Sequence, residues 1–177
     1  MGDFGTLIAT CTIGFERLLP GPAEPIWAYL TQGALLRRWL GCGDIEERAG
    51  APIQIRLLPD EAAAPEAISV TGVVWRCEPP CLLEYTWIAP VPESQNYTSI
   101  VTFTLKVQGE QTLLTLTQRP LLPEYRSRTL SGWHALLDRL QSALSGETPP
   151  PFPEIFQRVL PEYERRISAA DAERLAS

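Results

Sequence analysis

Apolar and polar side chains alternate through much of the middle of the chain. Within Thr98–Val107 the apolar residues Val101, Phe103 and Leu105 are separated by threonines, and this period of two predicts a strand with one buried face. A short turn at residues 108–111 joins it to a second predicted strand, Thr112–Gln118. The other strand-like segments are Ile8–Leu19, Asp44–Arg48, Pro52–Leu58, Ile68–Glu78 and Leu82–Trp87. No long crossovers separate these strands, so the predicted sheet is antiparallel.

A period of 3.6 residues takes over near the C-terminal end of this region. Five large apolar residues share one face of a helix: Trp133, Leu136, Leu137, Leu140 and Leu144. They predict an amphipathic helix over Arg128–Leu144. Two short helices, Ala23–Leu30 and Gly33–Leu40, are predicted between the first strand and the rest of the sheet. A last helical stretch, Pro153–Leu175, is expected to be weakly interrupted at Pro161.

This order of elements predicts an α+β architecture with two layers. A curved antiparallel sheet of about six to seven strands is expected to wrap around the long C-terminal helix. We expect one domain at residues 8–146, followed at 147–177 by a linker and a C-terminal helical extension that braces the domain or dimerises it. A sheet that bends around one helix leaves room between the two layers, where an apolar pocket for a small ligand is expected.

Charge and composition exclude some classes of partner. The 177 residues carry a net charge of −6 and no basic patch, so no nucleic-acid partner is predicted. No stretch approaches the roughly 18 consecutive apolar residues of a membrane helix, and the first five residues lack the pattern of a secretory signal. We therefore predict a cytoplasmic protein with no membrane partner and with reduced cysteines. Pro59–Glu66, rich in alanine and acidic residues, is predicted to be a surface loop.

The residue types that usually hold metals or carry out catalysis are poorly arranged in this sequence. Only Cys77 and Cys81 have a spacing that suits zinc, whereas Cys11 and Cys42 lie on distant elements, so small buried thiols are the expected reading. The acidic residues cluster in loops and at strand ends, and phosphate-loop and dinucleotide motifs are missing. We therefore predict no metal site, no cofactor and no catalytic residue.

The aromatic residues give the most specific candidate site. Several lie on elements expected to line the space between sheet and long helix, with Arg119 and Tyr85 as orienting polar groups. His134, the single histidine, is expected at the edge of the apolar helix face, where it would reach the mouth of the pocket. The predicted ligand-contacting residues are Trp39, Trp75, Trp87, Tyr97, Phe103, Arg119, Trp133, His134 and Leu137. The alternative is that the aromatic side chains simply fill the core.

Several segments together resemble a known family. They are Ile13–Pro22, Ile26–Thr31, Leu36–Leu40, Gly72–Pro80, Leu83–Trp87, Ser99–Phe103 and Gly132–Leu140. Spread over about residues 10 to 146, they resemble the START/SRPBCC superfamily, and within it the bacterial proteins whose domain is named after the activator of heat-shock protein 90 ATPase. The resemblance implies a helix-grip fold and a general theme of hydrophobic ligand binding. Relatives often have a histidine where this chain has Gln118, so proton transfer by such a histidine is excluded here.

Three functions remain open on the sequence alone. The first is binding of a small apolar molecule between the sheet and the helix Arg128–Leu144. The second is a protein-interaction or chaperone-cofactor module that uses an exposed face. The third is an enzyme of the cyclase, dehydratase or hydrolase type, which requires His134 or a carboxylate to point into the pocket.

Overall fold

A computed structural model describes residues 4–57, 68–90 and 97–175 of the chain. The predicted surface loop Pro59–Glu66 lies outside these residues. The strands are β1 (Thr6–Ala9), β2 (Thr12–Pro20), β3 (Gly41–Cys42), β4 (Pro52–Leu57), β5 (Ser69–Glu78), β6 (Leu82–Ile88), β7 (Thr98–Gln108) and β8 (Gln111–Arg119). The helices are α1 (Ala23–Thr31), α2 (Gly33–Leu36), α3 (Arg126–Leu144) and α4 (Phe152–Leu175), with a short 3₁₀ turn at Pro123–Tyr125.

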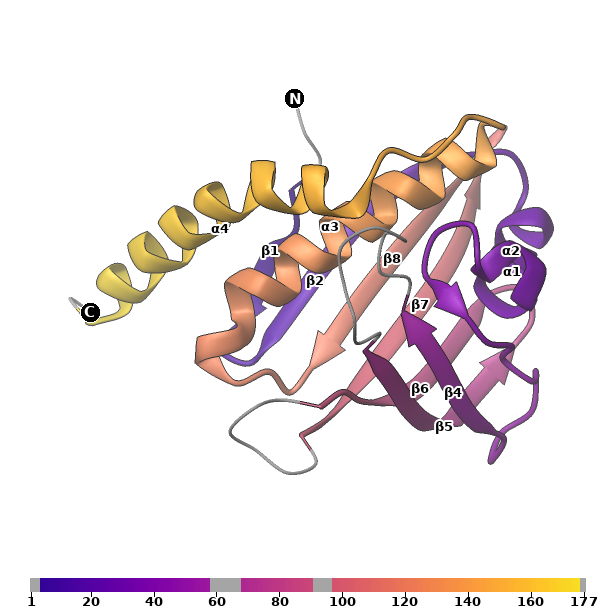
Figure 1. Cartoon of the computed structure of the whole chain (residues 1–177), viewed down its shortest axis with the longest axis horizontal. Coiled ribbons are helices and arrows are strands. Elements are labelled where there is room, and N and C mark those ends of the chain that lie inside the picture. Colours follow the sequence, from indigo (N-terminus) through magenta and orange to yellow (C-terminus); the bar gives the residue numbers. More distant parts are fainter. Residues whose placement is uncertain (1–3, 58–67, 91–96, 176–177) are drawn as a thin grey trace.

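All strands of the described residues belong to one antiparallel sheet of eight strands in the order β1-β2-β8-β7-β6-β5-β4-β3. The sheet curves around α3, and α4 lies over α3 on the side away from the sheet (Figure 1). This is the helix-grip fold that the resemblance implied. Strand β2 pairs with β8 along its whole length, from Ile13 opposite Gln118 to Pro20 opposite Gln111, so the first long strand closes against the last one.

The sheet has more strands than the six to seven expected, and one predicted strand is wrong. The segment Ile8–Leu19 divides into β1 and β2, which form a hairpin of their own. Asp44–Arg48 forms no strand, because its groups bond to the α1–α2 corner instead. The Asp44 carboxylate accepts from the amide of Gly33 at 2.7 Å, and the amide of Ile45 donates to the carbonyl of Thr31 at 3.0 Å. The short strand β3 comes just before this segment.

One face of the sheet supplies most of the core. On β6, Leu83, Tyr85 and Trp87 are buried, and the residues between them are only partly covered. The same alternation on β7 and β8 turns Phe103 and Leu116 toward α3. The opposite face carries threonines and other polar side chains and is left without a covering helix in the part of the chain that the structure describes. A buried inner face and a solvated outer face are typical of an antiparallel sheet under one helical layer.

The C-terminal extension packs directly on the domain. Gly146, with φ of +74°, ends α3, and the amide of Glu147 donates back to the carbonyl of Ser142 at 2.9 Å. These are the features of a Schellman cap, which reverses the chain after a helix. Three residues spaced by four along α4 are buried: Ile155, Val159 and Tyr163. The helix continues through Pro161 without the expected interruption.

An ion pair fastens the far end of α4. The guanidinium of Arg126, at the start of α3, donates to both carboxylate oxygens of Asp171 at 3.1 and 2.7 Å. Such bidentate pairs combine charge attraction with a fixed geometry. The extension therefore braces the domain at both ends of the α3–α4 contact. Dimerisation through it stays a prediction.

Candidate functional site

A cluster of five aromatic rings occupies the interior between sheet and α3. Its members are Trp39, Tyr85, Trp87, Phe103 and Trp133, all of them buried. Trp133 of α3 lies at the centre, with ring centroids 5.2 Å from Trp87 and 5.9 Å from Phe103. Tyr85 stacks on Trp87 at 6.3 Å. These separations are those of rings in contact, so the aromatic side chains fill much of the space in which a cavity was predicted.

A chain of polar groups runs through this apolar interior. The indole N–H of Trp133 donates to the Gln118 side-chain carbonyl at 2.7 Å, and the Gln118 amide donates to the Ser99 hydroxyl, also at 2.7 Å. The Ser99 hydroxyl in turn lies 3.4 Å from the carbonyl of Trp87. Gln118 therefore holds the central tryptophan in one orientation. The alternation of β8 placed Gln118 on the inner face, but nothing in the sequence indicated Ser99 as its partner.

The hydroxyl of Tyr85 is the unusual polar group of the interior. Tyr85 has an exposed fraction of 0%, and its hydroxyl has no hydrogen-bond partner among the described residues. Burial raises the pKa of this phenol well above its usual value, because the charged form would be still more poorly solvated. Leaving a buried hydroxyl unbonded costs about 1–3 kcal/mol. The indole N–H of Trp27, on α1, is a second buried donor without a described partner.

Only some of the predicted site residues lie together in the interior. Five lie in the interior beneath α3: Trp39, Trp87, Phe103, Trp133 and Leu137. Tyr97 is half-buried at the start of β7, and its hydroxyl donates to the carbonyl of Pro120. Arg119 is exposed, because it follows the inward-facing Gln118 and so points to the other face of the sheet. The five interior residues thus lie where the pocket was predicted, whereas Arg119 points away from it.

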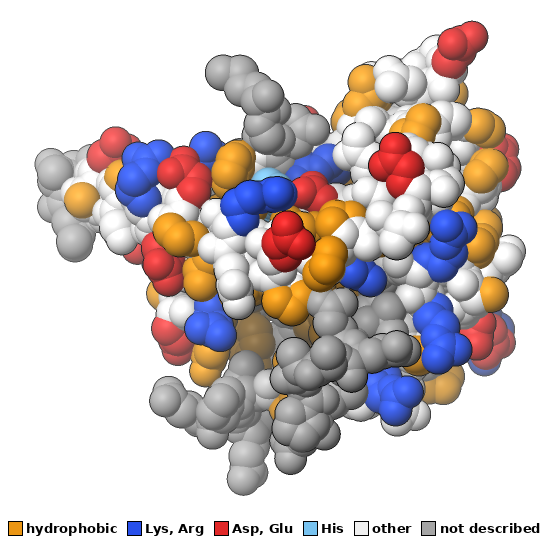
Figure 2. Space-filling view, turned by 45° about the horizontal axis from the view of Figure 1, so that its top comes forward, with side chains coloured by type: hydrophobic (Ala, Val, Ile, Leu, Met, Phe, Trp, Pro, Cys, Tyr) orange, Lys and Arg blue, Asp and Glu red, His pale blue; other side chains and the backbone are white. Residues whose placement is uncertain are grey.

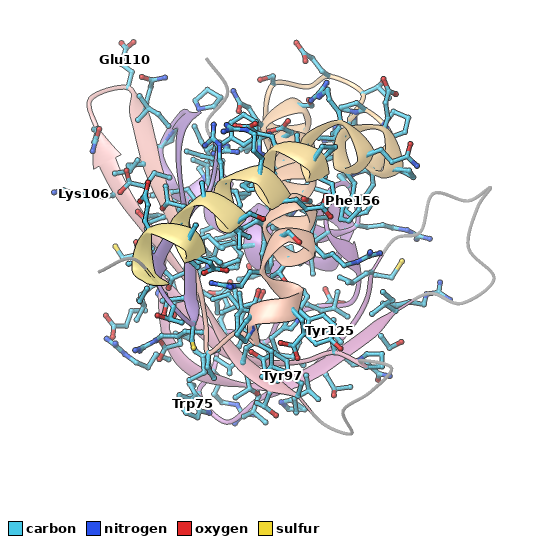
Figure 3. The ribbon with its side chains drawn as sticks, turned by 90° about the vertical axis from the view of Figure 1, so that its left-hand side faces the viewer. Trp75, Tyr97, Lys106, Glu110, Tyr125 and Phe156 are labelled. Atoms are coloured by element: carbon cyan, nitrogen blue, oxygen red, sulfur yellow. The ribbon has the colours of Figure 1, made fainter. Side chains whose placement is uncertain are left out.

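The placement of Trp75 in the pocket wall is wrong. The register of β5 against β6 shifts between Val74 and Arg76, so Trp75 is the inserted residue of a bulge. Val74 takes the inward position opposite Tyr85, and Trp75 is 53% exposed on the outer face. Figure 3 shows Trp75 on the side of the sheet away from the helices. The alternation from Val70 to Val74 already directs Trp75 to the outer face, and the bulge changes the phase of the strand only after it.

His134 does not reach the interior pocket either. It lies on the flank of α3 that faces the first strands and α4, and there it lines an open cavity of about 670 Å³. Arg17, Asp138, Arg158, Phe4 and Val159 also line this cavity. In Figure 2 the pale-blue histidine surface lies among basic and acidic side chains. Two features of the sequence point to this site: an arginine at an inward position of β2, and an aspartate one helical turn after His134.

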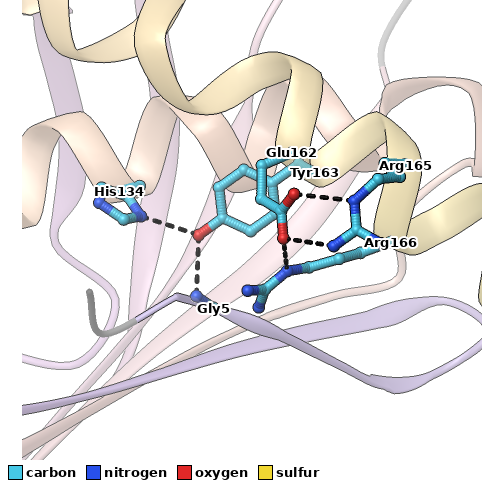
Figure 4. A network of polar contacts seen from close by, with 6 residues as sticks. All are labelled: Gly5, His134, Glu162, Tyr163, Arg165 and Arg166. Atoms are coloured by element: carbon cyan, nitrogen blue, oxygen red, sulfur yellow. Dashed lines mark hydrogen bonds and ion pairs between the residues drawn. The ribbon is translucent and has the colours of Figure 1, made fainter. Parts of the chain in front are cut away.

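Both ring nitrogens of His134 have a neighbour. Nδ1 lies 2.9 Å from the hydroxyl of Tyr163 on α4, and Nε2 lies 3.5 Å from the Asp138 carboxylate. The Tyr163 hydroxyl also accepts from the amide of Gly5 at 2.8 Å (Figure 4). The three segments that meet here are therefore held together by one buried phenol.

The raised pKa of Tyr163 predicts that the protein loses stability in alkaline solution. Burial raises the pKa of its phenol to about 12, whereas an unfolded tyrosine ionises near pH ~10. Above pH ~10 the unfolded chain gives up this proton while the folded chain keeps it, so the free energy of unfolding should fall between about pH 10 and 12. Urea denaturation at pH 9 and pH 11 measures this change. The Tyr163→Phe variant should show a shallower decline, and an equal decline in both proteins would contradict the assignment.

The cysteines and carboxylates form no metal site in the described part of the chain, where no group of three potential ligands converges. All four cysteines are free thiols, but Cys11 and Cys81 are exposed rather than buried as expected, because both lie at turns. Among the helices of the described residues, none combines the length and the apolar character needed to cross a bilayer.

Comparisons with known proteins agree with the fold. The family model described as activator of Hsp90 ATPase homolog 1-like protein matches residues 20–145. The solution structure of the protein encoded by gene BPP1335 from Bordetella parapertussis is 34% identical, with a TM-score of 0.76 over 94% of this chain and 91% of that one. Protein MLL2253 from Mesorhizobium loti is 27% identical, with a TM-score of 0.65 over 76% and 97%. CalU16 from Micromonospora echinospora is 20% identical with a TM-score of 0.68 over 93% and 95%, a likeness of fold alone. No curated protein matches the chain significantly.

Proposed function

Because the chain belongs to the family of activator of Hsp90 ATPase homolog 1-like proteins, whose fold suits ligand binding, we propose that it binds a small, mostly apolar molecule with one polar group in the interior between the sheet and α3. The observation that carries the proposal is the Tyr85 hydroxyl, fully buried and without a described partner. A ligand oxygen or nitrogen at that point removes the cost of the unbonded hydroxyl. The aromatic walls supply the apolar contact.

Binding in this interior requires some movement of the rings. Trp87, exposed at 8%, is the most accessible member of the cluster, and it stacks on Tyr85 and contacts Trp133. In the proposed site, rotation of the Trp87 ring would give a ligand access to the Tyr85 hydroxyl. Trp39, Phe103 and Leu137 form the deeper wall of the proposed site. The ligand is a small molecule held by burial of apolar surface, worth about 25 cal/mol per Å².

Native mass spectrometry of the purified protein, before and after organic extraction, tests whether a small molecule is retained. A mass that extraction removes supports the proposal and begins to identify the ligand. Binding of a defined probe gives a second test that does not depend on co-purification. 2-Naphthol has an apolar body and one hydroxyl, and naphthalene lacks that hydroxyl, so their difference in affinity reports the polar contact.

Tyr85→Phe should separate the polar contact from the apolar one. We expect wild-type protein to bind 2-naphthol about 3–10-fold more tightly than naphthalene, as one hydrogen bond would give, measured by quenching of tryptophan fluorescence. In Tyr85→Phe this preference should disappear while naphthalene binding is kept. Tyr125→Phe, a change in a half-buried tyrosine near the start of α3, is the control. The proposal would be contradicted if Tyr85→Phe kept the preference for 2-naphthol over naphthalene, or if neither probe bound measurably to the wild-type protein.

A protein partner is a second candidate function, favoured by the outer face of the sheet. Trp75 and Val73 lie there with exposed fractions of 53% and 40%. Exposed large apolar residues are enriched in protein interfaces. Sedimentation of the full chain at several concentrations distinguishes self-association through this face, which Trp75→Ala should abolish, from a monomer. The cytoplasm remains the predicted location.

A further inference from the structure

The inner face of the sheet presents one row of side chains to the proposed interior site. Tyr85 of β6 pairs with Val74 of β5 on one side and with Val101 of β7 on the other. Val101 in turn pairs with Gln118 of β8, whose side-chain oxygen and nitrogen are both bonded in the polar chain described above. Within this row of described residues, the Tyr85 hydroxyl is therefore the polar group that is left to bond a ligand.

The described strands bury no charged side chain on the part of the sheet that faces this site. The buried positions of β4 to β8 hold apolar or aromatic residues and three uncharged polar ones, Ser99, Thr112 and Gln118. The buried arginines lie elsewhere. Arg17 of β2 lines the open cavity beside His134, and Arg126 binds Asp171 of α4.

An ionised ligand in the interior would therefore be buried without a counter-charge. Tyr85 cannot provide one, because burial raises the pKa of its phenol and keeps it neutral. Burial of an unpaired charge is far more costly than burial of a neutral polar group, and an ionisable group at such a position loses its charge instead. The surroundings of Tyr85 thus favour an uncharged ligand.

The hydroxyl of Tyr85 also decides which kind of polar group fits. A phenol has one proton to donate and an oxygen that can accept. A ligand oxygen that accepts this proton satisfies the donor, whereas a ligand group that only donates leaves the proton unbonded. Among buried backbone groups, donors without a partner are rarer than acceptors without one. A ketone has a further advantage over a hydroxyl compound, because it brings no second proton into the apolar interior.

We propose that the interior site binds uncharged aromatic compounds whose oxygen accepts a hydrogen bond from Tyr85, and that aryl ketones fit it best. This inference rests on the proposed function and adds the chemical class of the ligand. The aromatic walls around Trp133 favour contact with a planar ring. Carboxylates, phosphates and ammonium compounds are excluded because their charge would have no partner in the interior.

The exclusion of charge can be tested with 4-nitrophenol on the wild-type protein. This ligand loses its proton near neutral pH, and its phenolate is yellow, so absorbance reports which form is bound. At pH 8 the protein should lower the phenolate absorbance, because the neutral form is bound and a proton is taken up from the buffer. The apparent Kd should rise about tenfold per pH unit above the pKa of the ligand, as expected for one proton. 4-Nitroanisole, which cannot ionise, is the control and should keep one Kd from pH 6 to pH 8.

The acceptor requirement can be tested with two probes of nearly equal shape. 2-Acetylnaphthalene carries a carbonyl oxygen, and 2-isopropenylnaphthalene has a methylene group in its place. The affinity ratio of ketone to alkene should be at least fivefold higher in wild type than in Tyr85→Phe, because only the wild-type hydroxyl can bond the carbonyl. Tyr125→Phe should keep the wild-type ratio. 2-Naphthol should displace both probes and 4-nitrophenol, which places them in the same site.

The two proposals can fail separately. Binding of the phenolate as tightly as the neutral form, or an equal ketone-to-alkene ratio in wild type and Tyr85→Phe, overturns the ligand class. Either result leaves 2-naphthol binding, and with it the proposed function, standing. Binding of 4-nitrophenol that 2-naphthol does not displace also overturns the inference, because the charge is then read at another site. If no naphthalene probe binds, the proposed function and the ligand class fall together.

Discussion

Trp133→Ala is expected to lower the free energy of unfolding by about 3–5 kcal/mol, the usual cost of removing a buried aromatic side chain. Trp133 is 3% exposed and contacts the rings of both Trp87 and Phe103. The substitution opens a cavity among these rings and leaves the side-chain carbonyl of Gln118 without the indole donor. Urea denaturation followed by circular dichroism measures the change, and loss of 2-naphthol binding should accompany it.

Trp75→Ala is the matched control, because it removes the same side chain from the outer face. Because 53% of the Trp75 surface is exposed, Trp75→Ala should change the free energy of unfolding by only about 1 kcal/mol or less. It should leave 2-naphthol binding intact. Similar destabilisation in the two variants would contradict the outward position of Trp75 and the central position of Trp133.

Tyr163→Phe should have the second largest effect, a loss of about 2–3 kcal/mol. The missing hydroxyl leaves the amide of Gly5 and Nδ1 of His134 without their shared partner, and each buried group left unbonded costs about 1–3 kcal/mol. The readout is again the urea midpoint, together with hydrogen exchange at the amide of Gly5, which should become faster.

The same chemical change at Tyr85 should raise the free energy of unfolding instead of lowering it. Tyr85 is also buried, but its hydroxyl has no described partner, so Tyr85→Phe removes a desolvation cost and should raise the free energy of unfolding by about 1 kcal/mol in the ligand-free protein. Opposite effects of these two tyrosine-to-phenylalanine substitutions on the free energy of unfolding would be hard to explain by packing alone. Destabilisation in both would show that Tyr85 is bonded in solution.

The fold could be predicted from the sequence where one face of an element meets the core. The alternation in β7 and β8 and the 3.6-residue period of α3 each follow from burial on one side. The prediction failed at Asp44–Arg48, where an acidic side chain and a backbone amide bond to the α1–α2 corner. Those partners lie more than ten residues away, and no periodic pattern encodes them.

The candidate site was harder to predict for a physical reason. A position on a strand or helix gives the direction of a side chain only relative to its own element. Trp75 was expected in the pocket wall although it follows the inward-facing Val74, and His134, expected at the mouth of the pocket, instead contacts α4 near the segment around Gly5. The partners of Gln118 and Tyr163 come from distant segments, so they appear only once the chain is folded.

The hydrogen bond between Gly5 and Tyr163 joins residues 158 positions apart, and this separation bears on the order of folding. Contacts between distant segments are slow to form, because loop closure must precede them. The hairpins that join consecutive strands from β4 to β8 are local and can form while α4 is still being synthesised. The open cavity beside His134, which α4 covers on one side, is therefore expected to be the last part of the domain to assemble and the first to open, as a separate unit of local unfolding.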